Sequence, residues 1–292
     1  MFTGMPDDGA RNHGDRARAA LAGSRFADVR WVASTGSTNA DVLALARDGA
    51  PEGVVVVADH QTAGRGRYDR TWVAPPGGSL LLSVLLRPPS RVASATTMAT
   101  AVAMADAVEE VVTGVSPELK WPNDLVVAGE GGERKLAGIL AEADWPASAT
   151  ISAGWREPSE HERAVVVVGV GLNVSWPQDN EATHDLADVA DAAVALNWLT
   201  SVTIDRVELL VAFLRRLDQS YGQLVSEGPQ TAMDEWRRRS ATLGRRVRVD
   251  LGPDDVEGTA VDVTAEGHLV VEAPGGRRRT FAVGDVIHLR GA

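Results

Sequence analysis

The chain of 292 residues contains no cysteine. This absence excludes disulfides, cysteine–zinc sites and cysteine nucleophiles. It is typical of a protein kept in the reducing cytoplasm, where we expect this one to act. The sequence also lacks an apolar run long enough to span a bilayer. Its polar first 20 residues lack the apolar segment of a signal peptide, so we expect neither secretion nor a membrane partner.

Several common nucleotide and hydrolase motifs are also missing. No Gly-Lys-Ser or Gly-Lys-Thr occurs, so there is no Walker A loop, and no Gly-x-Ser-x-Gly nucleophile elbow occurs. Gly-x-Gly pairs stand at residues 64–66 and 169–171, but Asp69 and Val174 occupy the place of the third glycine in a Rossmann fingerprint. The 6 histidines have no metal-ligand spacing, which argues against a histidine-bound metal.

Charge and aromatic content limit the partners further. The formal net charge is −11, and the chain has only 2 tyrosines. Nucleic acid attracts basic surfaces and stacks on aromatic rings, so we expect no DNA binding. Hydrophobic residues at 44% and charged residues at 24% are ordinary for a globular protein, and the length allows one large domain with a small one.

The hydrophobic pattern divides the chain into three parts. We expect residues 1–27 to form a disordered or partly helical tail, with residues 1–14 disordered. Residues 28–242 predict an α+β domain, a mixed sheet with helices packed on it. Its strands are expected at 30–34, 54–59, 79–86, 135–142 and 165–174, with a strand pair interrupted by Pro122-Asn123-Asp124 in residues 118–127. Its helices are expected at 37–49, 93–112, 205–224 and 231–240. Residues 145–163 predict a variable loop or an extra hairpin. Short strands with glycine turns in residues 243–292 predict a small β barrel.

A basic segment interrupts this acidic chain between two buried strands. Residues 60–78, the arginine loop, contain Arg65, Arg67 and Arg70, two closely spaced glycines and Trp72. Arginines favour bidentate contacts to phosphate or carboxylate, and glycines let backbone N–H groups approach an anion. The pattern therefore indicates a site for a small anion; a solvated surface turn is the alternative.

Three further segments combine polar and backbone features of a site. Residues 120–124, Lys-Trp-Pro-Asn-Asp, end a strand with a cation and a carboxylate, although a simple Pro-Asn-Asp turn would explain them too. Lys135 begins an apolar strand, where a lysine usually faces solvent. Gly169 and Gly171 lie in a strongly β-forming run, where each costs roughly 0.5–1 kcal/mol relative to alanine. Close approach of a ligand or another backbone would justify this cost; a β-bulge is the alternative.

Taken in order and spacing, these segments resemble the biotin protein ligase family. The matching pieces are Ser37-Thr38-Asn39, Gln61 with Gly64-Arg65-Gly66-Arg67 and Trp72, residues 120–124, residues 135–140, residues 169–173 and the C-terminal residues 284–290. The resemblance implies a catalytic domain at 28–242 and an SH3-like barrel at 243–292. It also implies the form without an N-terminal DNA-binding domain, because the segment before Arg30 is too short for one. The family commonly has glycine where this chain has Asp69, an acid that could pair with Arg67 or Arg70 and order the loop in advance.

The resemblance implies a reaction in two steps. Biotin and ATP, with Mg²⁺, form biotinyl-5′-AMP, and a lysine of a biotin carboxyl carrier protein or domain of biotin-dependent carboxylases then takes the biotin. The residues that it implies for catalysis are Lys135, Arg65 and Arg67. Those implied for biotin binding are Ser37, Thr38, Asn39, Gln61, Gly64, Arg65, Lys135 and Gly138. Those implied for ATP or adenylate are Arg67, Arg70, Trp72, Lys120, Asn123 and Asn173, with Asp124 as a candidate Mg²⁺ ligand.

Two alternatives from the same residues stay open at this point. A lipoate-type protein ligase has a similar fold, but such ligases carry an Arg-Arg, a triple-glycine run and a His-Asp pair. The corresponding region here reads Ala74-Pro75-Pro76-Gly77-Gly78-Ser79, and the related octanoyltransferases need a cysteine. The second alternative is a non-enzymatic nucleic-acid-binding module, built from a basic loop and a small barrel. The net charge argues against it.

Overall fold

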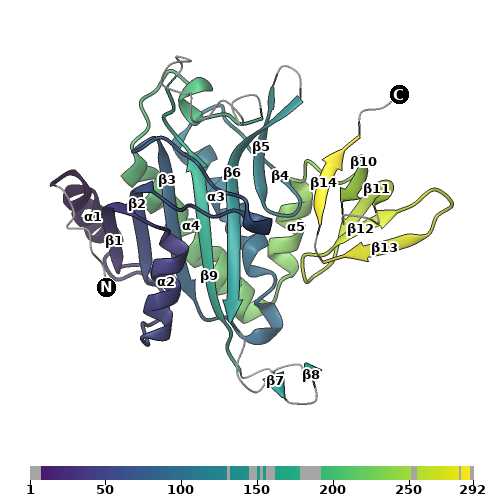
Figure 1. Ribbon diagram of the computed structural model, residues 1–292, viewed down its shortest axis with the longest axis horizontal. Coiled ribbons are helices and arrows are strands. Elements are labelled where there is room, and N and C mark those ends of the chain that lie inside the picture. Colours follow the sequence, from purple (N-terminus) through teal and green to yellow (C-terminus); the bar gives the residue numbers. More distant parts are fainter. Residues whose placement is uncertain are drawn as a thin grey trace.

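The computed structural model describes residues 8–129, 132–144, 150–151, 154–155, 162–177, 192–250, 255–282 and 284–289. A large sheet with helices on both faces is followed by a small separate sheet at the C-terminal end (Figure 1). The predicted α+β class, with a mixed-sheet domain and a small C-terminal β domain, is confirmed.

The large sheet has seven strands in the order β1-β2-β3-β9-β6-β5-β4. These are β1 (Val29–Thr35), β2 (Val55–Gln61), β3 (Ser79–Leu86), β9 (Val165–Asn173), β6 (Gly132–Asp144), β5 (Asp124–Gly129) and β4 (Glu118–Lys120). Only β1 and β2 run parallel, so the sheet is mixed. Every residue of β3 is buried, as expected for a continuous apolar run covered on both sides.

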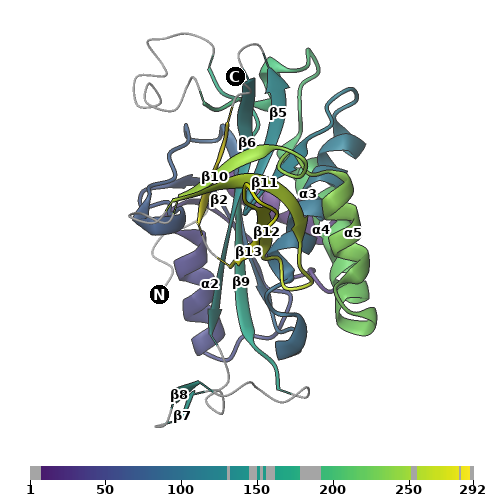
Figure 2. The same ribbon diagram turned by 90° about the vertical axis from the view of Figure 1, so that its right-hand side faces the viewer.

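Five helices cover the sheet: α1 (Asp8–Ala20), α2 (Thr38–Arg47), α3 (Thr96–Val111), α4 (Arg206–Glu227) and α5 (Gln230–Arg238). Helix α2 lies on one face, and α3, α4 and α5 lie on the other (Figure 2). The side chains of β9 therefore point alternately to the two faces of the sheet. Val168 and Val170 join the core beneath α3 and α4, whereas Val167 packs with α2.

The expected disorder of residues 8–14 is wrong. These residues belong to α1, whose Ala10, Gly14 and Ala17 are buried. Gly14 packs so closely that an added Cβ would lie 3.3 Å from Trp31 Cβ. This stripe of small residues contributes little hydrophobicity, so composition alone gave no sign of packing. Residues 1–7 of the expected tail lie outside the described residues.

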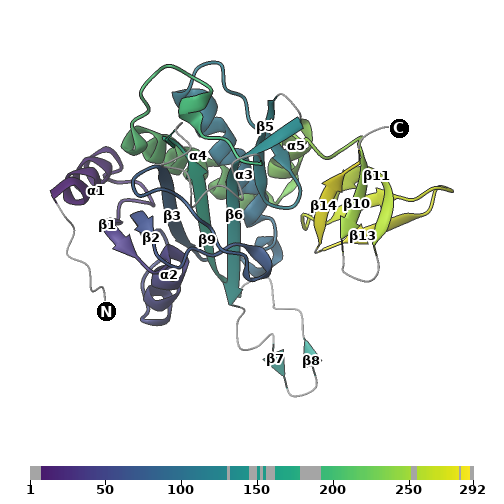
Figure 3. The ribbon, with the colours of Figure 1, turned by 45° about the horizontal axis from the view of Figure 1, so that its top comes forward.

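The C-terminal sheet has five antiparallel strands in the order β13-β12-β11-β10-β14 (Figure 3). They are β10 (Arg246–Asp250), β11 (Val256–Val263), β12 (Leu269–Glu272), β13 (Arg278–Phe281) and β14 (Asp285–His288). We call this unit the barrel. It meets the large domain at the buried Trp121, whose Nε1 donates to the carbonyl of Gly267 at 2.9 Å.

Two short elements complete the picture. Strands β7 (Thr150–Ile151) and β8 (Gly154–Trp155) pair antiparallel, so the expected loop or hairpin between residues 145 and 163 contains a small hairpin. Within the described part of the chain, no helix has the length and apolar character to cross a membrane.

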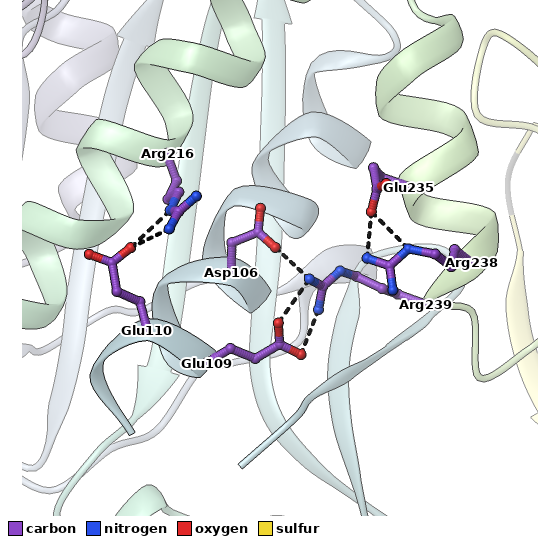
Figure 4. Close-up of polar contacts among 7 residues, drawn as sticks. All are labelled: Asp106, Glu109, Glu110, Arg216, Glu235, Arg238 and Arg239. Carbon is purple, nitrogen blue, oxygen red and sulfur yellow. Dashed lines mark hydrogen bonds and ion pairs between the residues drawn. The ribbon is translucent and has the colours of Figure 1, made fainter. Parts of the chain in front are cut away.

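An ion-pair cluster fixes the end of α5 against α3 (Figure 4). The guanidinium of Arg239, 10% exposed, donates to both carboxylate oxygens of Glu109 at 2.8 and 2.9 Å and to Asp106 at 2.5 Å. The Arg239 hydrogen bonds lower the pKa of Glu109, whereas burial raises the pKa of Asp106. The residues just after Arg239 then pair with Leu119 of β4. The cluster thus holds the chain that leads from the large domain into the barrel.

Candidate active site

A cavity of about 500 Å³ opens on the α2 face of the sheet, over β6 and β9. It is lined by all the site residues predicted from the motifs except Gly64: Ser37, Thr38, Asn39, Gln61, Arg65, Arg67, Arg70, Trp72, Lys120, Asn123, Asp124, Lys135, Gly138 and Asn173. Gly64 lies on a neighbouring groove, where an added Cβ would meet the backbone oxygen of Trp72 at 2.5 Å. The barrel contributes Asp250 and residues 285–287 to the cavity wall.

One end of the cavity is a network of neutral polar groups at the start of α2. Gln61 Oε1 accepts a hydrogen bond from the backbone N–H of Thr38 at 2.8 Å and lies 3.1 Å from Thr38 Oγ1. Ser37 holds the N-cap position with φ −158°, but its side chain makes no capping bond and so stays available to a ligand. Uncharged donors and acceptors of this kind suit a neutral polar ring rather than an anion.

The same network continues into the sheet. Ser83 Oγ lies 2.7 Å from Thr38 Oγ1 and 2.5 Å from Asn39 Oδ1. The amide of Asn39 donates to Glu142 Oε2 at 2.8 Å and to the carbonyl of Leu140 at 3.2 Å. Asn39 is only 4% exposed, so its side chain is fixed on both sides. A rigid polar floor for the cavity follows.

Three strand glycines make room for the side chains that line the cavity. A Cβ added to Gly169 would lie 2.1 Å from Asn39 Oδ1. Added Cβ atoms on Gly138 and Gly171 would lie 2.8 and 2.5 Å from the indole of Trp72. The β3–β9 and β6–β9 registers run without a shift past Gly169 and Gly171, so the bulge interpretation is wrong. The glycines serve close approach, and the groups that approach are Trp72 and Asn39.

Each of the five cations on the cavity wall has a carboxylate partner. Lys135 Nζ lies 2.6 Å from Asp124 Oδ1, an ion pair rather than an aligned hydrogen bond, and 5.4 Å from the centroid of the Trp72 ring. The remaining pairs are Arg65–Glu142 at 2.7 Å, Lys120–Glu133 at 4.0 Å, Arg67–Asp285 at 3.6 Å and Arg70–Asp285. Lysines usually face solvent, but Lys135 lines the cavity and pairs there with Asp124. The cations of the wall are thus balanced by carboxylates of the protein itself.

The arginine loop departs from an ordinary surface turn. Tyr68 and Asp69 have φ of 53° and 57°, in the left-handed region. Glycine adopts that region without strain, so a glycine suits position 69, whereas Asp69 holds this conformation at a cost. The acid that pairs with Arg67 and Arg70 is not Asp69 but Asp285 of the barrel.

Residues 120–124 do form a turn, and the turn is part of the site. Trp121 is buried, and the Trp121–Pro122 peptide is cis. The amide of Asn123 donates to the carbonyl of Ile139 at 2.7 Å, which fixes the turn against β6. Lys120 and Asp124 thereby flank the cavity from opposite ends of the turn.

Two buried polar atoms on the cavity wall have neither a hydrogen bond nor an ion pair: the indole Nε1 of Trp72, a donor, and Oδ1 of Asn173, an acceptor. Asn173 is 1% exposed, and its amide donates to the carbonyl of Val194 at 3.1 Å. Buried groups are rarely left unpaired in native proteins. We infer that these two atoms face a ligand.

Sequence reasoning missed three polar residues of the site: Ser83, Glu142 and Asp285. Ser83 is a buried polar residue in the apolar strand Ser79–Leu86, a signal that was present in the sequence. Glu142 follows Lys135 on the same strand, but only the tertiary structure brings it to Arg65 and Asn39. A further signal is composition, because Lys120 and Lys135 are the only lysines of the chain, and both line the cavity.

Comparison with known proteins agrees with this geometry. Residues 31–150 match the biotin/lipoate A/B protein ligase family, and residues 242–289 match the biotin protein ligase C-terminal domain. A biotin–[acetyl-CoA-carboxylase] ligase of Mycobacterium tuberculosis is 39% identical over 276 residues, covering 92% of each chain. The chain belongs to the biotin protein ligase family. The resemblance drawn from the motifs is thus confirmed.

More distant members of the biotin protein ligase family agree. The bifunctional ligase/repressor BirA of Bacillus subtilis is 29% identical, over 84% of this chain and 70% of its own. The solved biotin protein ligase of Aquifex aeolicus in complex with biotin and ATP superposes with a TM-score of 0.70 at 24% identity. The match covers 91% of this chain and 100% of that chain, and it shows the shared fold.

Proposed function

We propose that the chain is an ATP-dependent ligase that forms biotinyl-5′-AMP from biotin and ATP and then transfers biotin to a lysine of a biotin carboxyl carrier domain. The observation that carries the proposal is the cavity itself. It joins a neutral polar floor, suited to the ureido ring of biotin, to a wall with five cations, suited to the carboxylate and the phosphates. We also propose that residues 28–242 form the catalytic part and residues 243–292 an accessory barrel.

The first step must bring two anions together. The biotin carboxylate oxygen attacks the α-phosphorus of ATP, a C–O–P link forms, and the bond to pyrophosphate breaks. We assign to Lys135 the role of offsetting the repulsion between these two anions, since it projects beside Trp72 into the cavity. One ammonium–oxyanion contact at about 4 Å and an effective dielectric near 20 is worth about 4 kcal/mol before desolvation. Arg65 and Arg67 are assigned to the same charge by bidentate contact.

We propose that magnesium enters as the ion of the substrate MgATP. The described residues contain no cluster of three or more potential metal ligands, so a resident metal centre lacks support. Mg²⁺ is commonly held by one or two carboxylates with substrate phosphates and water. Asp124 is the candidate carboxylate; in taking the ion it would free Lys135 for the reacting oxygens.

Trp72 and Asn173 are proposed to hold the adenylate. Trp72 lies against Gly138 and Gly171, so its ring can cover the intermediate and keep water from the mixed anhydride. The unpaired Oδ1 of Asn173 is an acceptor suited to an amino group of the nucleotide, and the unpaired Nε1 of Trp72 is a donor. Ser37, Thr38, Asn39, Gln61 and Gly138 are assigned to biotin, and Arg70, Lys120 and Asn123 to ATP.

A groove of about 980 Å³ on the other side of the arginine loop supports the transfer step. It shares Arg67 and Asn123 with the cavity and runs between the start of α3 and the barrel. We propose that the carrier's lysine reaches the acyl carbonyl from this groove and that AMP leaves. The names of the Mycobacterium tuberculosis and Paracoccus denitrificans relatives point to the carrier of acetyl-CoA carboxylase. We propose that the protein acts in the cytoplasm.

The test is pyrophosphate release from MgATP with biotin or lipoate as the second substrate. Biotin should support release at a rate at least tenfold above that with lipoate. Equal or greater release with lipoate would overturn the assignment. Transfer is then scored by mass spectrometry of a purified biotin carboxyl carrier domain, with its lysine replaced by arginine as the control.

A further inference from the structure

The arginine loop is attached to the barrel through one carboxylate. Asp285 of β14 lies 3.6 Å from Arg67 and also pairs with Arg70. The side chains of Arg67 and Asp285 are only 20% and 26% exposed, so water screens this pair less than it would a surface pair. Arg67 also donates to the carbonyl of Gly284 at 3.3 Å, and the Tyr68 hydroxyl accepts from the backbone N–H of Gly284 at 3.0 Å.

These contacts hold a loop conformation that is unfavourable by itself. Tyr68 and Asp69 are consecutive non-glycine residues in the left-handed region, and such residues persist only when their surroundings fix them. The surroundings here are backbone hydrogen bonds within the loop and the contacts with Gly284 and Asp285 of the barrel. The conformation of the loop therefore depends on whether Asp285 and Gly284 stay in contact with it.

Three carboxylates pair with the cations of the cavity wall other than Lys135, and Asp285 is the replaceable one among them. Glu142, which pairs with Arg65, also receives a hydrogen bond from the buried Asn39 and is thereby fixed. Glu133 is held by Arg245 at 2.5 Å and His288 at 3.0 Å as well as by Lys120. Among the contacts of the described residues, the Asp285 carboxylate binds only the two loop arginines, and it lines the cavity.

A carboxylate and a phosphate occupy the same bidentate position on a guanidinium. We propose that Asp285 is an internal counter-ion that competes with the phosphates of the nucleotide for Arg67 and Arg70, so that nucleotide binding releases the arginine loop from the barrel. This inference rests on the proposed function of the loop as the nucleotide-phosphate site. It adds that the barrel senses nucleotide through a single carboxylate.

The first test compares steady-state pyrophosphate release by wild type and Asp285→Asn. Loss of the competing charge should lower the KM for ATP at least threefold, while the KM for biotin stays within twofold. Glu257→Gln is the matched control, since it removes one carboxylate of the same barrel that pairs with Arg246 at 3.8 Å, away from the loop. Its KM for ATP should stay within twofold of wild type. Asp285→Glu keeps the charge and should also remain close to wild type.

The second test needs no variant. Hydrogen exchange of wild type with saturating MgATP should increase at residues 284–288, because these residues lose their contacts with the loop. An unchanged or raised KM for ATP in Asp285→Asn, or increased protection at residues 284–288, would overturn the inference. If wild type releases no pyrophosphate with biotin, the proposed function itself fails, which is a separate result.

Discussion

Lys120 and Lys135 are the only two lysines in a chain otherwise provided with arginine, and both lie at one cavity. An ammonium group is a compact point charge with rotatable donors, whereas guanidinium is a rigid fork. Lys135 is held by Asp124 on one side and by the ring of Trp72 on the other. At the residue scale, position and chemistry together are the reasons for our assignment of Lys135 to the reacting charges.

We predict that Lys135→Ala lowers the single-turnover rate of biotinyl-AMP formation at least tenfold. The loss is less than the gross ~4 kcal/mol of one contact because desolvation offsets most of it. Rapid-quench measurement of pyrophosphate gives the rate. Arg245→Ala, a cation outside the cavity lining, should leave it within threefold. A wild-type rate in Lys135→Ala would refute the role given to this lysine.

The glycines of β9 allow a second prediction at the same scale. Gly171→Ala would place a methyl group 2.5 Å from Trp72 Cε2, so the indole must move out of the cavity. The adenylation rate should fall at least fivefold, and the fluorescence of Trp72 should change. Gly222→Ala in α4 is the control: its Cβ meets nothing within 4 Å, and alanine should stabilise that helix by about 0.5–1 kcal/mol. A wild-type adenylation rate in Gly171→Ala would mean that adenylation does not depend on the position of the Trp72 indole.

At the scale of elements, the cluster around Arg239 joins α3 to the end of α5 (Figure 4). Two carboxylates of one helix pair with the terminal nitrogens of a guanidinium that is only 10% exposed. The residues that follow α5 pair with Leu119, and the hydroxyl of Thr242 accepts a hydrogen bond from the backbone N–H of Trp121. The position of α5 therefore sets the position of residues 120–124. None of the residues of the cluster lines the cavity, and we expect its role to be stability.

Glu109→Gln should lower the free energy of unfolding by about 1–2 kcal/mol at neutral pH, because Arg239 would lose its bidentate partner while it stays buried. The pKa of Glu109 is lowered in the folded protein, chiefly by the Arg239 hydrogen bond. Its contribution is therefore present above the ordinary value of 4.5 and is lost as pH falls through the lowered folded value. Urea unfolding at several pH values should show the difference between wild type and variant shrinking at low pH.

Glu110→Gln on the same helix is the control for that experiment. Its pair with Arg216 at 2.7 Å is 44–45% exposed, and such a surface pair is worth about 0–1 kcal/mol. An equal loss in both variants would mean that the buried position of Arg239 does not matter.

The arginine loop is the element with the least support of its own. It is held by a few backbone hydrogen bonds, by contacts with Gly284 and by ion pairs to Glu142 and Asp285. Fixing about ten such residues costs on the order of 10 kcal/mol of backbone entropy. We predict that amide exchange over residues 64–71 slows when biotin and a non-reacting ATP analogue bind together. Strong protection in the free protein that does not increase would identify a fixed structural element. Amide exchange in β2, residues 55–61 of the large sheet, serves as the internal reference.

At the scale of the whole molecule, the large domain and the barrel meet around Glu133. This carboxylate, 12% exposed, contacts Lys120 of the cavity wall and Arg245 and His288 of the barrel. Thr242 adds a second link, since its hydroxyl accepts from the N–H of Trp121 and lies 3.3 Å from His288 Nε2. The same small region therefore holds both the domain contact and one cation of the site.

Burial lowers the pKa of His288 below its ordinary 6.5, although Glu133 opposes the shift. The folded protein thus resists protonation of this ring, and stability falls as pH drops from 6.5 toward the lowered folded value. His288→Asn lacks this titration. We predict that the stability advantage of wild type over the variant narrows in thermal unfolding as the pH falls below 6.5. An advantage that widens on acidification would contradict the sign of the shift.

The sequence by itself determined the elements and the ligand chemistry. Apolar runs such as Val54–Val57 and Ser79–Leu86 predict strands, and the polar motifs lie at the ends of such runs. Both can therefore be recognised from short stretches of sequence. The tertiary structure decided the rest. It decided that α1 is ordered by packing of small residues, that Asp285 and not Asp69 balances the arginine loop, and that Glu142 joins Arg65 to Asn39. Each of these depends on groups 77 to 218 positions apart or on burial of weakly apolar surface, neither of which a local pattern carries.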